Sequence, residues 1–391
     1  MAQHAAEKLH MRIFFLPVSL LSLSLAAGHA QVPNNLVADG MPVLSPELKA
    51  DAGRYLEFRD ASFNRWHPIR RELLITTRFA DTPQLHEVRR PGGARRQLTF
   101  SVEPVRGGAW QPRQGRYIVF ARDQGGGEFY QYYRLDPDQG RITLLTDGKS
   151  RNGGAHFTRS GRLMAYTSTR RTGRDNDVYV MNPAAPASDR LLCPLSGGGW
   201  TVADWSADES KLLLLEVISA NQSRVYLLEV KSGAKQLLTS DQGEPVAYGN
   251  PRFARDGPRV YFTSDKGTEF RQLGELHLKS GARRSLTANI PWSVDEFELS
   301  PDGKTIAFIT NEDGVGRLHL IDAASGKARR EPKLPLGIPS GVTWHENSRE
   351  IAFNFTSARS PTDVYSFDTK SGKLERWTES ETGGIPVANF V

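Results

Sequence analysis

The feature that most constrains the fold of this chain is a segment of about 46 residues that recurs seven times. Each copy contains an aromatic or apolar anchor, a polar turn, two apolar strands, a glycine turn and, in most copies, a Leu-Thr pair. A fixed period of this length is typical of propellers, solenoids and related arrays. The anchors are 44 to 48 residues apart and are Trp66, Trp110, Phe157, Trp205, Phe253, Leu299 and Trp344.

Each copy is predicted to form four short strands. The turn after the anchor is clearest at 300–304, where Asp302-Gly303 supplies the positive φ of a hairpin turn. The runs that follow such turns, for example 305–309 and 351–355, are rich in β-branched and aromatic residues, as strands are. The fourth strand ends in Leu-Thr or Trp-Thr in five copies, and the third and sixth copies lack this pair.

These strands predict an all-β fold, a seven-bladed β-propeller of four-stranded antiparallel blades over residues 54–380. One four-stranded unit cannot bury both of its faces without a neighbour on each side. A β-helix is the alternative, but its repeats are far shorter. All four strands of the seventh blade can be found between Gly341 and Thr378. We therefore expect packing between blades one and seven to close the ring, although residues 54–58 could add an edge strand.

The N-terminus has the pattern of a cleaved signal peptide, residues 1–30, with Met11 as a possible true start. Lys8 and Arg12 precede an apolar run at 13–27, and Gly28-His29-Ala30 has small residues where a signal peptidase cuts. A transmembrane anchor is the alternative, but this run is too short to cross about 30 Å of hydrocarbon. The sequence therefore predicts a periplasmic or secreted protein without a stable membrane anchor, in which 31–53 is a lead segment.

Composition excludes several classes of protein. With 38% hydrophobic and 24% charged residues the chain is globular, and the dispersed 36 Gly and 23 Pro indicate many tight turns. Cys193 is the only cysteine, so no intramolecular disulfide can form. The formal net charge of +6 could suggest nucleic acid, but the arginines are scattered in pairs at turns instead of lining one groove with aromatic residues. We expect no nucleic-acid partner.

The usual chemical motifs are absent. No serine has glycine two residues before and two residues after it, so there is no nucleophile elbow. The segments 148–150 and 303–305 resemble a phosphate loop, but both lack its earlier glycine and are better explained as hairpin turns. The nine histidines form no His-x-x-x-His pair. We expect no catalytic residue, no metal and no cofactor in this chain.

The most unusual segment is Gly125-Gly126-Gly127-Glu128-Phe129-Tyr130, between the second and third strands of blade two. Its glycines would let the backbone pass close to a partner, and the alternative is a wide turn. Tyr130, Tyr132 and Tyr133 could form a recognition surface, but at strand spacing such residues more often pack inside the protein.

Alternating strand directions place the connections of each blade on two opposite faces. The turns between strands one and two and between strands three and four share one face, which is predicted to be basic because of pairs such as Arg95-Arg96 and Arg283-Arg284. The other face is predicted to be acidic and to dock a partner through complementary charge. Its candidate docking residues are Glu128, Tyr130, Asp241, Glu244, Asp295, Glu296, Glu379 and Glu381.

The repeats resemble known propellers. The segment 299–308 is similar to TolB-like propeller repeats and, more closely, to the N-terminal propeller of bacterial prolyl oligopeptidase-type serine peptidases. The resemblance runs from about Arg54 to Val391. The segments that match the peptidase family are 65–68 (Arg-Trp-His-Pro), 127–131 (Gly-Glu-Phe-Tyr-Gln), 177–181 (Asp-Val-Tyr-Val-Met), 310–314 (Thr-Asn-Glu-Asp-Gly), 360–365 (Ser-Pro-Thr-Asp-Val-Tyr) and 376–381 (Arg-Trp-Thr-Glu-Ser-Glu).

The resemblance implies a non-catalytic role. In that family the last blade leads into an α/β-hydrolase domain with the Ser, Asp and His triad, and the propeller caps the active site. Because the sequence stops at Val391, no catalytic residue can be carried over, and 381–391 is expected to be a truncated linker toward an absent hydrolase. We therefore expect an inactive cap whose partner is a peptide or protein, such as a separately encoded hydrolase domain. The alternative is a stand-alone TolB-like scaffold that binds a peptide or an envelope protein.

Overall fold

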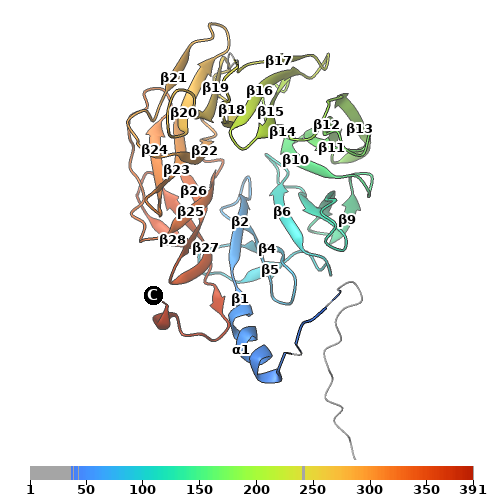
Figure 1. Ribbon diagram of the computed structural model, residues 1–391, viewed down its shortest axis with the longest axis vertical. Coiled ribbons are helices and arrows are strands. Elements are labelled where there is room, and N and C mark those ends of the chain that lie inside the picture. The colour runs from blue at the N-terminus through green and yellow to red at the C-terminus, as the bar shows by residue number, and fades with distance from the viewer. Residues whose placement is uncertain (1–36, 38, 43, 240–242, 391) are drawn as a thin grey trace, which may run out of the picture. The chain divides into compact units, whose positions relative to one another are not determined.

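A computed structural model describes residues 37, 39–42, 44–239 and 243–390. The chain divides into two compact units, Met1–Ala50 and Asp51–Val391, and the second unit contains every strand. The predicted signal peptide and its cleavage site lie outside the described residues, and so does Asp241. Figure 1 shows the strands of the second unit as a ring of separate sheets.

The first four blades each contain four strands in sequence order. Blade one comprises β2 (Ala61–Trp66), β3 (Leu73–Thr77), β4 (Gln84–Val88) and β5 (Arg95–Gln97). Blade two comprises β6 (Val105–Trp110), β7 (Ile118–Arg122), β8 (Gln131–Asp136) and β9 (Arg141–Leu144). Blade three comprises β10 (Asn152–Phe157), β11 (Met164–Ser168), β12 (Asp177–Asn182) and β13 (Ala185–Cys193). Blade four comprises β14 (Trp200–Trp205), β15 (Lys211–Ser219), β16 (Gln222–Glu229) and β17 (Lys235–Leu237).

Three further blades complete the ring and confirm the predicted seven-bladed antiparallel propeller. Blade five comprises β18 (Tyr248–Phe253), β19 (Arg259–Ser264), β20 (Gln272–His277) and β21 (Arg283–Ser285). Blade six comprises β22 (Val294–Leu299), β23 (Thr305–Glu312) and β24 (Val315–Asp322). Blade seven comprises β25 (Ile338–Trp344), β26 (Glu350–Ser357), β27 (Ser360–Asp368) and β28 (Leu374–Arg376).

Blade six departs from the predicted four strands. Its outer edge is reduced to one bridge between Ile321 and Ala328, beyond the three strands of the sheet. The following segment contains Pro332 and Pro335, which have no backbone N–H to donate to a ladder. The missing Leu-Thr pair alone does not predict this difference, because blade three also lacks the pair and has a nine-residue fourth strand, β13.

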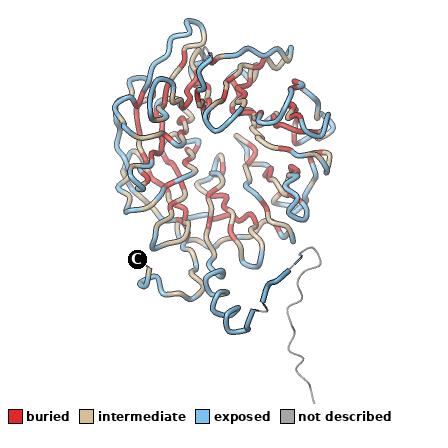
Figure 2. The backbone as a smooth tube through the Cα atoms, viewed as in Figure 1, coloured by how far each residue is buried: buried red, intermediate tan, exposed pale blue. Residues whose placement is uncertain are grey.

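The core lies in the interfaces between blades, where Figure 2 shows the buried segments. The anchors Trp110, Trp205 and Trp344 end the innermost strands and are 6%, 1% and 5% exposed, which confirms that they are packing residues. Trp205 Nε1 donates to the His156 carbonyl at 2.9 Å, and Trp344 Nε1 donates to the Glu298 carbonyl at 3.1 Å. Trp205 and Trp344 therefore each join their blade to the preceding one.

The Leu-Thr pair fastens the outermost strand to the third strand of the same blade. In the five copies that carry it, the threonine hydroxyl accepts a backbone N–H from the residue 14 positions earlier. In blade four, for example, the Val225 N–H donates to Thr239 Oγ1 at 3.0 Å. The Leu238 N–H in turn donates to the Val225 carbonyl at 2.8 Å.

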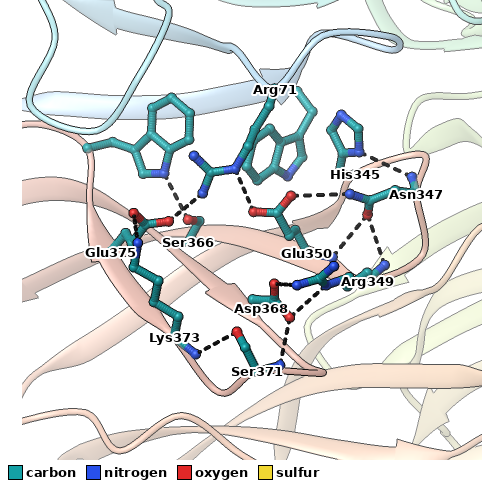
Figure 3. A network of polar contacts seen from close by, with 12 residues as sticks. Arg71, His345, Asn347, Arg349, Glu350, Ser366, Asp368, Ser371, Lys373 and Glu375 are labelled. Carbon is teal, nitrogen blue, oxygen red and sulfur yellow. Dashed lines mark hydrogen bonds and ion pairs between the residues drawn. The ribbon is translucent and has the colours of Figure 1, made fainter.

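Packing between blades one and seven closes the ring, as predicted. Ala61, Trp66 and Leu73 share one buried cluster with Val364 and Trp377. Polar contacts cross the same seam: the Phe63 N–H donates to Asn354 Oδ1 at 2.6 Å, and Arg71 reaches two carboxylates of blade seven (Figure 3).

The suggestion that residues 54–58 extend a blade is wrong. Residues up to Leu56 belong to α1 (Pro46–Leu56), in which no residue is buried. Ser45 caps this helix by accepting the Leu48 N–H at 3.1 Å, and proline suits the first helical position. β1 (Phe58–Arg59) then pairs with β29 (Glu381–Thr382) in a separate ribbon, and η1 (Val387–Asn389) follows. In the described parts of the chain, no helix is long and apolar enough to cross a membrane.

Candidate functional site

The connections between strands form two opposite faces of the propeller, because neighbouring strands in every blade are antiparallel. We call one the turn face; it carries the turns between strands one and two and between strands three and four. We call the other the loop face; it carries the loops between strands two and three and the loops that join successive blades. Its described segments are 78–83, 98–104, 123–130, 145–151, 169–176, 194–199, 220–221, 238–239, 243–247, 265–271, 286–293, 313–314, 331–337, 358–359 and 377–380.

Every described residue of the predicted docking set lies in, or next to, a loop-face segment, distributed over several blades. Glu128 and Tyr130 lie in the loop between β7 and β8, and Glu244 precedes β18. Asp295 and Glu296 lie at the start of β22. Glu379 follows β28, and Glu381 begins β29. The set is therefore spread around the ring and does not form one compact cluster.

Several of these carboxylates already have partners inside the propeller. Glu296 Oε1 accepts the Val342 N–H at 3.2 Å, and burial raises the pKa of this carboxyl group. Glu381 forms a 2.7 Å ion pair with Arg59, and Asp295 lies 3.7 Å from the Arg271 guanidinium. Glu379, whose side chain is 86% exposed, lies 3.9 Å from the Arg376 guanidinium.

The glycine-rich segment forms a projecting loop with defined local contacts. Gly125, Gly126 and Glu128 have φ values of 62°, 71° and 58°, which explains the need for glycine at the first two positions. The Gly125 N–H donates to Glu103 Oε1 at 3.0 Å, and the Glu128 N–H donates to Asp123 Oδ2 at 3.0 Å. Beside the loop, Glu128 and Tyr130 line a hollow of about 250 Å³ together with Arg151, Asn152, Gly153, Thr167 and Asn176.

The three tyrosines after this loop divide between packing and surface. Tyr132 is buried and contacts Tyr166 edge-on, with ring centroids 5.7 Å apart. Tyr133 stacks on Phe120 at 5.5 Å, so both residues pack, as strand spacing favoured. Tyr130 lies at the surface under the Arg106 guanidinium, at 5.3 Å from the ring centroid.

Sequence reasoning missed the exposed apolar side chains of the loop face. Phe100, Val102 and Leu336 are 79%, 90% and 78% exposed to solvent. Phe79, Phe129 and Ile218 are also exposed at loop-face positions. A signal was present: Phe100 and Val102 follow Leu98-Thr99, which ends blade one, so no strand was left to bury them. Phe100 and Val102 lie between blades one and two and Leu336 lies between blades six and seven, and these side chains are candidates for contact with a partner.

The central channel is lined by the residue that precedes each anchor. These residues are Arg65, Ala109, His156, Asp204, Arg252, Glu298 and Thr343, and each of the seven inner strands has a register shift nearby. Such bulges re-aim side chains, here toward the axis. The Arg252 guanidinium lies 3.8 Å from Glu298, and burial lowers the pKa of His156 to about 3. The charges of the lining largely cancel one another.

The channel narrows toward the turn face. Arg159 of blade three donates from its guanidinium to the Pro301 carbonyl of blade six at 2.9 Å, across the ring. A cavity of about 250 Å³ lies beside this contact and is lined by Arg65, His156, Glu298 and Glu346, among other residues. The channel therefore offers room for a small group.

Comparison with known proteins gives one family match and several more distant relatives. A family model described as the prolyl oligopeptidase N-terminal beta-propeller domain matches residues 107–380. The Tol-Pal system protein TolB of Francisella tularensis subsp. holarctica is 24% identical over 226 residues, which are 57% of this chain and 50% of that protein. The uncharacterized peptidase YuxL of Bacillus subtilis is 26% identical over 129 residues, which are 30% of this chain and 19% of that protein.

A solved structure shares the fold. It comes from a structural and mechanistic analysis of two prolyl endopeptidases and matches with a TM-score of 0.70 at 16% identity. The match covers 85% of this chain and 52% of that chain. This chain therefore spans about half the length of the TolB relatives and of the matched prolyl endopeptidase.

Proposed function

Since the chain belongs to the family of prolyl oligopeptidase N-terminal β-propeller domains, we propose that it is the non-catalytic cap of an exported prolyl oligopeptidase-type serine peptidase. In this proposal the loop face docks an α/β-hydrolase domain, and the propeller limits access to the active site of that domain. The channel, which Arg159 narrows, would then admit only short peptides.

The exposed apolar set of the loop face carries this proposal. Phe100, Val102 and Leu336 lie in connections between blades, and burying such side chains against a second domain releases about 25 cal/mol per Å² of apolar surface. The chain also enters and leaves the propeller on this face, because Asp60 leads into β2 and Thr378 follows β28. A domain joined to either end would therefore begin on the face that carries the apolar set.

A pull-down experiment tests the docking. The DNA downstream of the Val391 codon is sequenced, and any α/β-hydrolase reading frame with Gly-x-Ser-x-Gly is expressed together with the propeller. We expect the two chains to purify together and Phe100→Glu to weaken the complex at least tenfold. Ile69→Glu is the matched control, because Ile69 is 63% exposed but lies on the turn face. Equal loss with both variants would overturn the docking face.

The purified chain alone is expected to be inactive. No serine in its sequence has the Gly-x-Ser-x-Gly environment of a nucleophile elbow. The mature chain should therefore neither cleave prolyl reporter substrates nor react with a fluorophosphonate probe. A stoichiometric adduct on any serine would contradict the non-catalytic assignment.

Export is the second part of the proposal and is tested separately. Residues 1–30 have the charged, apolar and small-residue regions of a signal peptide. Fractionation should place the chain in the periplasm or the medium, and N-terminal sequencing should begin at Gln31. A cytoplasmic chain that retains residues 13–27 would refute export without affecting the docking proposal.

A TolB-like peptide-binding scaffold is the second candidate function. The observation that favours it is the 24% identity to the Tol-Pal system protein TolB over 57% of this chain. If no hydrolase reading frame lies nearby and the exported chain purifies with an envelope protein instead, this second function replaces the first.

A further inference from the structure

Five adjacent blades carry an exposed basic side chain in the turn between their third and fourth strands. We call this set the cationic arc, and it consists of Lys231, Lys279, Lys327, Lys370 and Arg90 from blades four, five, six, seven and one. Within the part of the chain that the structure describes, none of the five has a carboxylate within ion-pair distance. The arc is interrupted at blade two, whose turn holds Asp138, and at blade three, whose turn is uncharged.

The turn chemistry fixes where these cations lie. In four of the five turns the basic residue lies beside a Ser-Gly pair, and Gly233, Gly281, Gly326 and Gly372 have φ values between 71° and 77°. The glycine N–H closes the turn; Gly281, for example, donates to the His277 carbonyl at 2.8 Å. The lysine is left at the solvent-facing position of the same turn. Each of these four turns therefore carries one exposed lysine, which precedes the Ser-Gly pair at Lys231, Lys279 and Lys370 and follows it at Lys327.

Neighbouring arginines have structural roles that the cationic arc lacks. Arg284 donates to the Ala324 carbonyl at 2.9 Å, and Arg330 donates to the Ser371 carbonyl at 2.8 Å, so each ties its blade to the next. Nearby carboxylates also have ion-pair partners: Asp322 pairs with Arg329 at 2.6 Å, and Glu275 pairs with Arg284 at 3.0 Å. Contacts within the propeller thus account for these arginines and carboxylates but not for the cationic arc.

We propose that the cationic arc binds the surface of a bilayer that contains anionic phospholipids. The turns between the third and fourth strands of the blades all lie on the turn face, so a flat charged surface can approach all five residues together. Each Lys or Arg near an anionic leaflet adds to the attraction, and the effect falls off within a Debye length. The loop face points away from such a surface and stays open to its own partner.

The same observations disfavour nucleic acid as the ligand. A duplex is a narrow rod that would have to bend to follow an arc spread over five blades. Single strands are held by bases that stack on exposed aromatic side chains. Among the described residues of the propeller, the exposed aromatic side chains Phe79, Phe100 and Phe129 all lie on the loop face.

Vesicle flotation with the mature chain tests the proposal. Vesicles of phosphatidylcholine with about 30 mol% phosphatidylglycerol should bind the chain at about 0.1 M salt and lose it at about 0.5 M salt, because screening shortens the range of attraction. The fourfold variant Lys231→Gln, Lys279→Gln, Lys327→Gln and Lys370→Gln should bind at least tenfold more weakly. The matched control, Lys149→Gln, Arg174→Gln, Lys333→Gln and Arg359→Gln, removes the same charge from the loop face and should bind like the wild type.

Three outcomes would overturn the bilayer proposal. They are equal binding to pure phosphatidylcholine vesicles, equal loss in the two fourfold variants, and tighter binding to a 20-base-pair duplex than to the anionic vesicles. Circular dichroism of each variant checks that the propeller is intact. Phe100→Glu should leave vesicle binding unchanged, so failure of the docking proposal and failure of the bilayer proposal are separate results.

Discussion

At the scale of single residues, threonine hydroxyls complete hydrogen bonding where strand ladders end. The fourth strand of a blade is short, as in β5, β17, β21 and β28, which have three residues each. The third strand therefore extends past its partner and would leave a buried N–H without an acceptor. Five threonines supply that acceptor at the same spacing, and all five are buried. Buried polar groups without partners are costly, which explains why the pair recurs.

We expect Thr239→Val to destabilise the propeller by about 1–3 kcal/mol. Valine keeps the shape of threonine but leaves the buried Val225 N–H without its 3.0 Å acceptor. Thr239→Ser keeps the hydroxyl and should lose less stability. Denaturant unfolding measures both variants, and equal losses would show that the methyl group, not the hydrogen bond, matters.

A buried histidine makes stability depend on pH. His67 is 1% exposed, and its Nδ1 accepts the Ile69 and Arg70 N–H groups at 3.2 and 3.0 Å. Burial, reinforced by the nearby Arg70, lowers the pKa of His67 to about 4. The folded protein thus favours neutral His67, whereas the unfolded chain protonates it near pH 6.5. Its contribution is present above pH 6.5 and is lost as pH falls toward 4.

His67→Asn should therefore flatten the acid side of the stability profile. The asparagine Oδ1 can accept the same two N–H groups but does not titrate. Between pH 7 and pH 4 the wild type should lose about 3 kcal/mol more than the variant, from 1.36 kcal/mol per pKa unit. Unfolding at several pH values separates this slope from any constant cost of the smaller side chain, and parallel profiles would refute it.

At the scale of elements, the innermost strand of each blade combines two tasks. Its register shift turns one residue, such as His156 or Asp204, toward the channel, and the next residue anchors the blade. In blade four that anchor is Trp205, which packs in one cluster with Val178 and Val180 of blade three and Leu212 of its own blade. Channel lining and blade packing therefore depend on the same three-residue segment.

Trp205→Ala should cost about 3–5 kcal/mol. The side chain is 1% exposed, and its removal leaves a large cavity and an unsatisfied His156 carbonyl. Trp205→Phe retains most of the apolar volume and should cost less. An unchanged thermal midpoint for Trp205→Ala would show that the blades do not depend on their anchors.

At the scale of the whole molecule, the repeat was enough to predict the propeller, but not its surfaces. The number of blades follows from the period of the repeat. The way in which the ring closes follows from blade seven, whose four strands all lie in one stretch of the sequence. Both features depend on contacts within one repeat or between neighbouring repeats. The residues of the loop face were predicted from charge alone. Glu296 accepts a hydrogen bond from the Val342 N–H of the adjacent blade, and the sequence of a single repeat does not reveal this contact. The exposure of Phe100 likewise depends on where blade one ends.

The seam between blades one and seven joins segments that lie almost 300 residues apart in the sequence. Arg71 donates from Nε to Glu350 Oε1 at 2.7 Å and from a terminal nitrogen to Glu375 Oε2 at 2.5 Å. Its guanidinium also lies over the Trp377 ring, 4.9 Å from the centroid. Figure 3 shows Arg71 reaching from blade one into this network of blade seven. One side chain thus bridges two carboxylates and covers a buried tryptophan of blade seven.

Arg71→Met should therefore weaken ring closure by about 1–3 kcal/mol. Methionine keeps an apolar stem over Trp377 but leaves Glu350 and Glu375 without the arginine, and both carboxylates are mostly buried. The loss stays below that of a fully buried ion pair because the Arg71 side chain is 38% exposed. Thermal unfolding measures the loss, and hydrogen exchange should show faster opening in β2 and β25 than in strands of blade four.

Arg349→Met is the matched control for Arg71→Met. Arg349 pairs with Asp368 inside blade seven, and its side chain is similarly exposed at 49%. Removing it costs an ion pair but no contact between the first and last blades. If Arg71→Met and Arg349→Met destabilise the protein equally and leave exchange in β2 alike, apolar packing alone closes the ring. A larger loss for Arg71→Met, centred on β2 and β25, would show that charge holds the two ends of the propeller together.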